Sequence, residues 1–215
     1  TYYWRVLGAD GEVETARFRT PDAATVQNGF SMGVTGDWRG ETAPYPAIKN
    51  AAAAGLDLFV KLGDTIYADY PTAAVPAAQA TTLAEYRAKQ AEVYTPVAGL
   101  DPWGALQKTT AILATIDDHE VINDFAGGAP AASDPRFGTN TGLINDTTLY
   151  ENGLQAFQEY NALENRFYPN TGSAPATDGE RQLYRYSVQG KDAAVFVLDA
   201  RSFRDTELAP PASLT

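Results

Sequence analysis

Apolar and polar residues alternate over the first twenty positions in the manner of two β-strands. The segments 2–7 and 13–19 carry the alternation, and a Gly-Ala-Asp-Gly turn at 8–11 separates them. The pattern predicts a β-hairpin. Two strands alone cannot bury a core, so we expect residues 1–20 to end an N-terminal β-sandwich domain and residues 21–28 to be a linker.

From residue 29 onward, short apolar segments alternate with helical patterns. Strands are predicted at 29–35, 57–62, 111–116 and 193–198. Helices are predicted at 45–54, 82–96 and 146–163. This order predicts an α/β or α+β fold in which helices cover a sheet. The stretch 126–145 is rich in Gly and Pro and is expected to be an irregular loop of the kind that often carries function.

The predicted elements do not complete a domain. A sheet of about four strands with helices normally needs further elements to close its core. We therefore expect residues 29–215 to be the N-terminal part of a domain whose C-terminal part lies outside this sequence.

An excess of acidic residues limits the partners of the chain. The formal charge is −11, from 27 acidic and 16 basic residues, which repels nucleic acids and anionic membrane surfaces. No apolar run approaches the roughly 20 residues of a membrane span. The acidity is explained either by bound cations, which help an acidic protein to act on an anion, or by solubility in a salty medium.

Sulfur and imidazole ligands are nearly absent, since the chain has no cysteine and His119 is its single histidine. Disulfides, thiolate nucleophiles and cysteine- or histidine-rich zinc sites are therefore excluded for this chain alone. The lack of a cysteine and of a second histidine also disfavours a metal-independent hydrolase with a catalytic triad. Any metal must be held mainly by oxygen, which points to calcium, magnesium or ferric iron.

The first cluster of candidate residues follows the predicted strand 57–62. Gly63 and Asp64 come directly after this strand, and Tyr67 follows three residues later. A carboxylate and a phenol at a strand end suit a shared cation, because loops at strand ends form the ligand crevice of open α/β sheets. The alternative is an ordinary Gly-Asp turn with Tyr67 in the core.

The second cluster is the run Asp117-Asp118-His119-Glu120 after the strand 111–116. Adjacent acids raise the pKa of one another unless a cation compensates, so we expect a metal ligand here and His119 as a hydrogen-bond donor or general acid. The carboxylates of Asp64 and Asp118 are expected within roughly 6 Å of each other. The alternative is a solvated polar turn.

The third cluster follows the strand 193–198. Asp199 ends this strand and Arg201 lies two positions on. The fork of an arginine suits phosphate oxygens because it bonds in two places. An Asp–Arg pair that ties a loop is the alternative.

The three clusters together resemble the successive motifs of the PhoD-like phosphatases and phosphodiesterases, over about residues 30–204. The matching segments read Gly-Asp-Thr-Ile-Tyr-Ala-Asp, Asp-Asp-His-Glu-Val-Ile-Asn-Asp-Phe and Leu-Asp-Ala-Arg-Ser-Phe-Arg. The resemblance implies an α+β fold, a metallophosphatase-like β-sandwich flanked by helices, incomplete here and preceded by the last hairpin of an N-terminal β-sandwich. It also implies a site that holds Ca²⁺ together with Fe³⁺.

The resemblance also implies roles for individual residues. His119 and Arg201 would face the substrate as catalytic groups. The implied metal ligands are Asp64, Tyr67, Asp118, Asn123 and Asp199, with Tyr67 as an iron-bound phenolate.

One position departs from the family pattern. Family members commonly carry a cysteine iron ligand at the end of the first catalytic strand, where this chain reads Thr35-Gly36-Asp37. Asp37 is expected to offer an oxygen in its place. Exchange of a thiolate for a carboxylate favours a harder metal. The further Asp and His ligands that metallophosphatases draw from C-terminal motifs are expected outside this sequence.

The resemblance implies metal-dependent hydrolysis of small phosphate monoesters or diesters by a metal-activated water, as in alkaline phosphatase D. Such a protein is expected in the periplasm or outside the cell, with its signal peptide not in this sequence. The alternative is a non-catalytic, calcium-binding extracellular module, which predicts scattered rather than clustered acids. Neither the oligomeric state nor the preference between monoesters and diesters follows from the sequence.

Overall fold

The computed structural model describes residues 1–138 and 141–208, so residues 139–140 of the expected loop and 209–215 of the expected domain lie outside the described residues. The strands are β1 (Tyr2–Leu7), β2 (Val13–Phe18), β3 (Met32–Thr35), β4 (Leu58–Lys61), β5 (Ala111–Ala114), β6 (Arg185–Gln189) and β7 (Ala193–Val197). The α-helices are α1 (Leu83–Tyr94), α2 (Pro102–Gln107) and α3 (Thr148–Tyr160). The mixture of helices and small sheets predicted from the sequence is confirmed.

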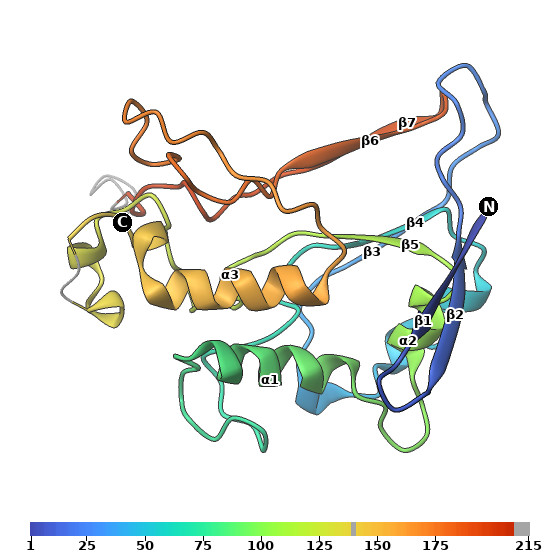
Figure 1. The fold of residues 1–215 in the computed structure, drawn as a ribbon, viewed down its shortest axis with the longest axis horizontal. Coiled ribbons are helices and arrows are strands. Elements are labelled where there is room, and N and C mark those ends of the chain that lie inside the picture. Colours follow the sequence, from blue (N-terminus) through green and yellow to red (C-terminus); the bar gives the residue numbers. More distant parts are fainter. Residues whose placement is uncertain (139–140, 209–215) are drawn as a thin grey trace, which may run out of the picture.

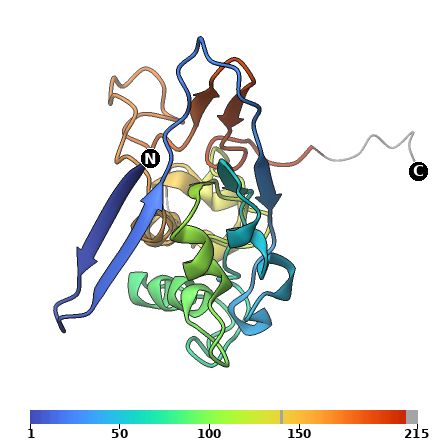
Figure 2. The same cartoon turned by 90° about the vertical axis from the view of Figure 1, so that its right-hand side faces the viewer.

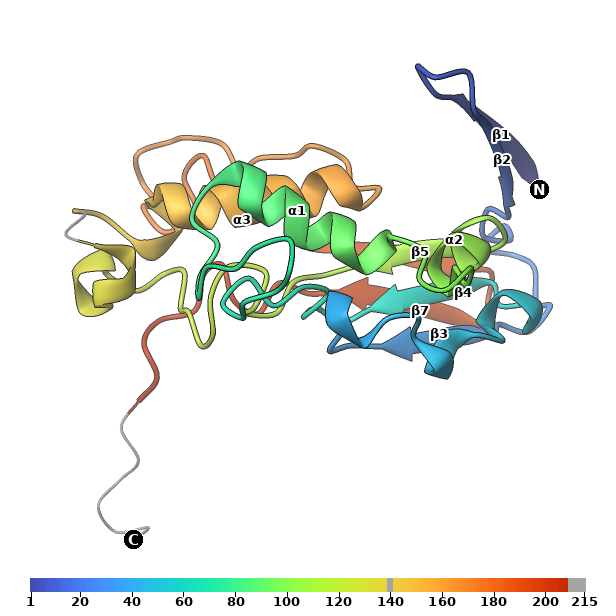
Figure 3. The same cartoon turned by 90° about the horizontal axis from the view of Figure 1, so that it is seen from below.

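The predicted N-terminal hairpin is present. β1 and β2 pair antiparallel from Tyr2↔Phe18 to Leu7↔Val13, and the hairpin projects away from the other strands (Figures 2 and 3). Within these two strands Ala16 alone is buried. The assignment of this hairpin, residues 1–20, to a β-sandwich domain stays a prediction.

A parallel sheet forms the centre of the molecule. Its order is β3-β4-β5, and the paired residues at the end of the ladder are Thr35, Lys61 and Ala114. β4 is central and all four of its residues are buried, as the apolar segment before Gly63 predicts. The three strands therefore end at one edge of the sheet, and the loops that follow them meet there (Figure 1).

Helices α1 and α3 lie side by side along one side of the parallel sheet (Figure 1). The predicted helices 82–96 and 146–163 are confirmed, with ends that differ by up to three residues. α1 begins at a capping box in which Thr82 and Glu85 exchange hydrogen bonds. In the described residues, no helix combines the length and the apolar character of a membrane span.

The predicted helix at 45–54 is wrong. The structure has two short 3₁₀ turns there, Pro46–Ile48 and Ala51–Ala53. Tyr45 has a left-handed backbone, with φ 57°, and Gly55 ends the segment with φ 67°. Between these two residues the backbone N–H groups of Ile48 and Ala53 donate to the carbonyl oxygens three residues back, which is the 3₁₀ pattern, although the alanines favour an α-helix.

The last predicted strand exists but lies outside the parallel sheet. β7 pairs antiparallel with β6, an element that the sequence pattern did not predict, and the two form a separate sheet. The turn between them contains Gly190 with φ 58°, and so short a connection joins only antiparallel strands. Figure 1 shows this hairpin and the helices on opposite sides of the parallel sheet. The sandwich architecture of metallophosphatases stays a prediction.

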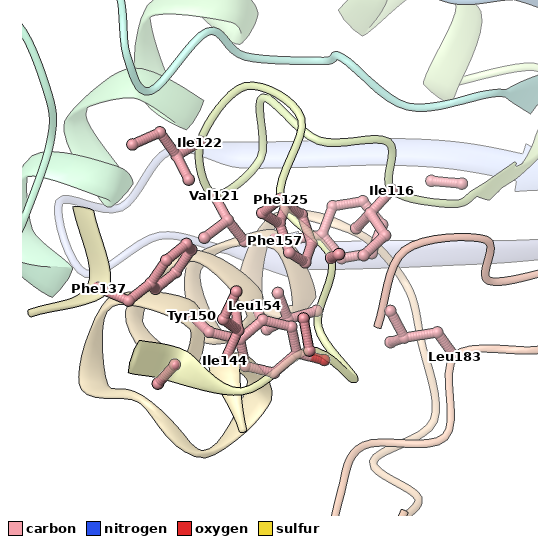
Figure 4. Close-up of a cluster of buried hydrophobic side chains, with 14 residues drawn as sticks. Ile116, Val121, Ile122, Phe125, Phe137, Ile144, Tyr150, Leu154, Phe157 and Leu183 are labelled. Carbon is pink, nitrogen blue, oxygen red and sulfur yellow. The ribbon is translucent and has the colours of Figure 1, made fainter. Parts of the chain in front are cut away.

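A cluster of buried apolar side chains packs α3 against the segment that follows β5 (Figure 4). Phe125 and Tyr150 meet edge to face, with ring centroids 5.9 Å apart. The predicted irregular loop 126–145 folds over this cluster in three short 3₁₀ turns. The loop after β5 is thus backed by a packed core and not by solvent.

Candidate active site

The loops after β4 and β5 are in close contact. After β4 the backbone turns through left-handed conformations at Gly63 (φ 107°) and Asp64 (φ 51°). A Cβ atom at position 63 would lie 2.1 Å from the backbone nitrogen of Asp117. Only glycine permits this approach, which brings Asp64 next to the run of acids after β5.

Glu120 links the two loops through hydrogen bonds to their backbones. Its side chain is fully buried, and its two carboxylate oxygens accept hydrogen bonds from the backbone N–H groups of Asp64 (3.0 Å), Thr65 (2.7 Å) and Asp117 (2.9 Å). Burial and the charge of Asp64 raise the pKa of Glu120 to about 7, against the three hydrogen bonds, which lower it. The sequence analysis missed this structural role.

Asp64, Asp118 and His119 form a group of potential metal ligands. One ligand atom from each lies within 4.8 Å of the others, so the expected approach of the two carboxylates is confirmed. The backbone N–H of His119 also donates to Asp64 Oδ1 at 3.2 Å. Burial raises the pKa of Asp64 to about 6, and the charges of Asp118 and Asp117 add to this shift while His119 opposes it.

His119 is held on two sides. Its Nδ1 lies 2.6 Å from Asp69 Oδ1, and its ring stacks on Tyr67 with centroids 4.0 Å apart. Asp69 is fixed in turn by the backbone N–H of Asn123 at 2.8 Å. Burial alone would lower the pKa of His119, but the hydrogen bond to Asp69 and the charges of Asp69, Asp64 and Asp118 raise it overall. Asp69 is a second residue that sequence reasoning missed.

Tyr67 lies beside Asp64, as its spacing predicts. Its hydroxyl donates to Asp64 Oδ2 at 3.5 Å. Burial and the charges of Asp64 and Asp37 raise the pKa of Tyr67 to about 12, and Arg39 opposes this shift. The backbone N–H of Asp37 donates to Gly63 O at 3.3 Å, so the loop after β3 reaches the same edge. Tyr67 is a phenol at neutral pH unless a cation binds it.

Arg201 reaches the group from the other sheet. Its Nε lies 2.5 Å from Asp117 Oδ1 and a terminal nitrogen lies 3.6 Å from Asp118 Oδ2. Asp199 instead caps its own turn, because its Oδ1 accepts hydrogen bonds from the backbone N–H groups of Arg201 and Ser202. Asn123 is exposed, and its amide donates to Asp124 Oδ2 at 2.7 Å. For Asp199, Asn123 and Asp37, a role as metal ligand stays a prediction.

A serine motif at residues 29–33 does not have the structure of a nucleophile elbow. Residues 29–33 read Gly-Phe-Ser-Met-Gly, which matches the elbow sequence of serine hydrolases. An elbow follows a strand and opens a helix, whereas Ser31 precedes β3. Its backbone N–H donates to Asp57 Oδ2 at 2.9 Å, so it serves the entry into the sheet.

Each missed residue belongs to a motif that was recognised for its neighbours. Asp69 ends the Gly-Asp-Thr-Ile-Tyr-Ala-Asp segment, and Glu120 ends the Asp-Asp-His-Glu run. In each motif, a carboxylate beyond the expected metal ligand was a signal of a further role. Their partners are backbone amides and an imidazole from another loop, which a linear sequence does not identify.

Three comparisons show which known proteins this chain resembles. The family model described as PhoD-like phosphatase matches residues 32–212. Alkaline phosphatase D of Bacillus subtilis (strain 168) is 30% identical over 172 residues, which cover 76% of this chain and 26% of that protein. A solved structure titled "Structure of PhoD" superposes with a TM-score of 0.71 at 24% identity, over 95% of this chain and 38% of that one. The chain thus spans well under half the length of both relatives. On the family match, this chain belongs to the PhoD-like phosphatase family.

Proposed function

We propose that this chain carries part of the active site of a phosphoester hydrolase that depends on hard cations. The observation that carries the proposal is the convergence of Asp64, Asp118 and His119 within 4.8 Å, with Arg201 bonded to the same acids. Clustered oxygen ligands beside a guanidinium suit an anionic ester better than a calcium-binding surface module, whose acids would be scattered. Membership of the PhoD-like family supports the same reaction class.

The donor set fits a hard cation. Asp64 and Asp118 offer carboxylate oxygens. Burial, with a smaller contribution from the charges of Asp118 and Asp117, raises the pKa of Asp64, and a bound cation would stabilise its ionised form. We propose Ca²⁺ as one ion, with oxygens from Asn123 and Asp199 as further ligands. We propose Fe³⁺ as the second ion, with Tyr67 as its phenolate and Asp37 in place of the family cysteine. When bound, such ions lower the pKa of a water molecule and neutralise charge on phosphoryl oxygens.

The protein's own residues bind and protonate the ester. Arg201, held by Asp117 and Asp118, presents its guanidinium to phosphoryl oxygens. His119 uses Nδ1 for its bond to Asp69, so Nε2 is the ring nitrogen that donates a proton to the departing ester oxygen. The negative charge of Asp69 keeps the imidazole protonated and oriented. The products are an alcohol and a phosphate, or a phosphate monoester if the substrate is a diester.

The proposed substrates are small phosphate monoesters and diesters, and the proposed location is the periplasm or the cell exterior. Calcium is plentiful outside the cytoplasm, and extracellular sites bind it with modest affinity. Kinetic measurements with p-nitrophenyl phosphate and bis(p-nitrophenyl) phosphate distinguish a preference for monoesters from one for diesters.

The proposed function is tested by metal analysis and turnover. We expect the protein to bind Ca²⁺ and to hydrolyse p-nitrophenyl phosphate or bis(p-nitrophenyl) phosphate, with both activities lost after chelation. Asp118→Asn should lower bound metal and reduce turnover by about 100-fold or more, since a ligand and its charge are removed. The matched control is Asp10→Asn in the β1–β2 turn, which should change neither. Full activity of the metal-free protein would contradict the proposal.

A further inference from the structure

Arg39 stands at the rim of the site, one ring away from His119. Its guanidinium carbon lies 3.8 Å from the ring centroid of Tyr70 and 5.2 Å from that of Tyr67. Tyr67 in turn stacks on His119 at 4.0 Å. The four side chains form one continuous wall that runs from the exposed Tyr70 to the imidazole.

The backbone holds Arg39 in place before any ligand binds. Its carbonyl oxygen accepts hydrogen bonds from the backbone N–H of Thr42 (2.9 Å), the hydroxyl of Thr42 (2.7 Å) and the hydroxyl of Tyr45 (3.1 Å). Its side chain is fixed by the two tyrosine rings and by Glu41, whose Oε1 accepts from Nε at 2.7 Å. A guanidinium fixed in this way loses little entropy when an anion binds.

The side chain of Arg39 is also more exposed to solvent than that of Arg201. The side chain of Arg39 is 31% exposed, whereas that of Arg201 is 13% exposed and engaged with Asp117 and Asp118. The protein has a formal charge of −11, which repels an approaching anion. An accessible cation at the rim of the site offsets this repulsion locally and so favours binding of the anion.

We propose that Arg39 is a substrate-binding residue, a second guanidinium that contacts the anionic oxygens of the phosphoester at the rim of the site. The proposal rests on the proposed function. The planar fork of arginine suits phosphate oxygens, and stacking between two tyrosines aligns that fork. Arg39 acts on affinity and not on the proton transfer, which belongs to His119.

The test compares three arginine variants in the metal-loaded protein. Arg39→Gln should raise KM for p-nitrophenyl phosphate and the inhibition constant of inorganic phosphate by about 10- to 100-fold, the range for a charged hydrogen bond, with kcat changed less than about threefold. Arg39→Lys should recover part of the affinity, because the charge stays and the fork is lost. The matched control is Arg87→Gln, which breaks an ion pair with Glu159 between α1 and α3 and should leave both constants unchanged.

Glu41→Gln separates substrate binding from a merely structural ion pair. If Arg39 binds the ester, removal of the Glu41 charge should leave KM unchanged or lower it, because the cation becomes less neutralised. If Arg39 only holds Glu41, both variants should raise KM alike, and the proposal falls. Bis(p-nitrophenyl) phosphate, with one negative charge fewer than the monoester, should show the smaller increase of KM in Arg39→Gln.

Direct titration with inorganic phosphate keeps the two hypotheses apart. Binding by the wild type that is weakened in Arg39→Gln supports the inference even where turnover is low. Wild-type binding that is equally tight in Arg39→Gln overturns the role of Arg39 and leaves the proposed function standing. If the metal-loaded wild type neither binds phosphate nor hydrolyses either ester, the proposed function itself fails, and the inference with it.

Discussion

The imidazole of His119 is positioned by three residues of the loop after β4. Asp69 binds its Nδ1, Tyr67 covers one face, and its own backbone N–H is bonded to Asp64. The pKa of His119 is raised, so its charged form persists above the ordinary value of 6.5 and is lost as the pH rises through the shifted value. In the proposed mechanism, protonation of the leaving group therefore depends on His119.

We expect His119→Ala to lower turnover by about 10²- to 10⁴-fold, the usual contribution of a positioned acid or base. Metal content should hardly change, because Asp64 and Asp118 hold the ions in the proposed site. Turnover, metal content and melting temperature are measured on the same preparation. Loss of metal would show that His119 is a ligand, and a lower melting temperature with intact turnover would remove it from catalysis.

Sequence reasoning located the candidate metal ligands Asp64 and Asp118 better than the residues that orient their loops. Asp64 and Asp118 follow apolar strands directly, and parallel strands end at one edge, so their convergence was predictable. Asp69 and Glu120 act on atoms of another loop, and no local pattern encodes such a partner. Asp199 is a different case, because it accepts hydrogen bonds from the backbone N–H groups two and three residues on, a local turn that the expected role as a metal ligand did not include.

At the scale of elements, the site depends on the close approach of two loops at Gly63. Any side chain at this position meets the backbone of Ile116 and Asp117 and not a flexible side chain. The neighbouring loop is itself held by α3, where a Cβ on Gly153 would lie 2.5 Å from the carbonyl oxygen of Glu120. Sheet, loops and helix thus leave little room for adjustment.

Gly63→Ala should lower the free energy of unfolding by about 3–5 kcal/mol, the sum of an unfavourable backbone conformation and a clash that only a shift of the loop relieves. The matched control is Gly55→Ala. Gly55 also has a positive φ, of 67°, but a Cβ there meets nothing within 4 Å, so its cost should be about 1–2 kcal/mol. Both values come from chemical denaturation. Equal losses in the two variants would contradict the close approach.

The elements that follow simple periodicity were predicted, and those that depend on tertiary context were not. The strands of the parallel sheet are short apolar segments, and α3 carries apolar residues at a helical period. Helix α1 has no such period, but it begins at a capping box and is rich in helix-forming residues. The segment 45–54 has helix-forming alanines, but its turns are decided by Tyr45 and Gly55. β6 has the length and burial pattern of β7, but its sequence Arg-Tyr-Ser-Val-Gln contains only two apolar residues where β7 contains five, so it lacks the apolar signal of a strand.

At the scale of the whole molecule, buried acids make stability depend on pH. Glu180 is 8% exposed and its Oε2 lacks a hydrogen-bond partner among the described residues. Burial raises its pKa to about 7, with further contributions from Glu151 and Asp146 and opposition from Arg181. The pKa of Glu180 in the folded protein lies above its ordinary value of 4.5, so the protein loses stability as the pH rises from that value to about 7.

Glu180→Gln should therefore raise the melting temperature relative to the wild type at pH 8, and the gain should shrink as the pH falls towards 5. The matched control is Glu159→Gln. Arg87 lowers the pKa of Glu159 to about 2, so this variant should lose stability at pH 8, with the opposite sign. Thermal unfolding at the two pH values gives both differences. A gain for Glu180→Gln that is independent of pH would assign the effect to packing instead.

The three hydrogen bonds to Glu120 also bear on how the molecule exchanges hydrogen with solvent. The amides of Asp64, Thr65 and Asp117 lie in loops, where exchange is ordinarily fast, yet each donates to a fully buried carboxylate. Their release requires the two strand ends to separate together, which is a cooperative opening. We expect these loop amides to exchange as slowly as those of β4, in mass spectrometry or nuclear magnetic resonance. Such protection would mark the strand-end loops as part of the most stable unit of the protein.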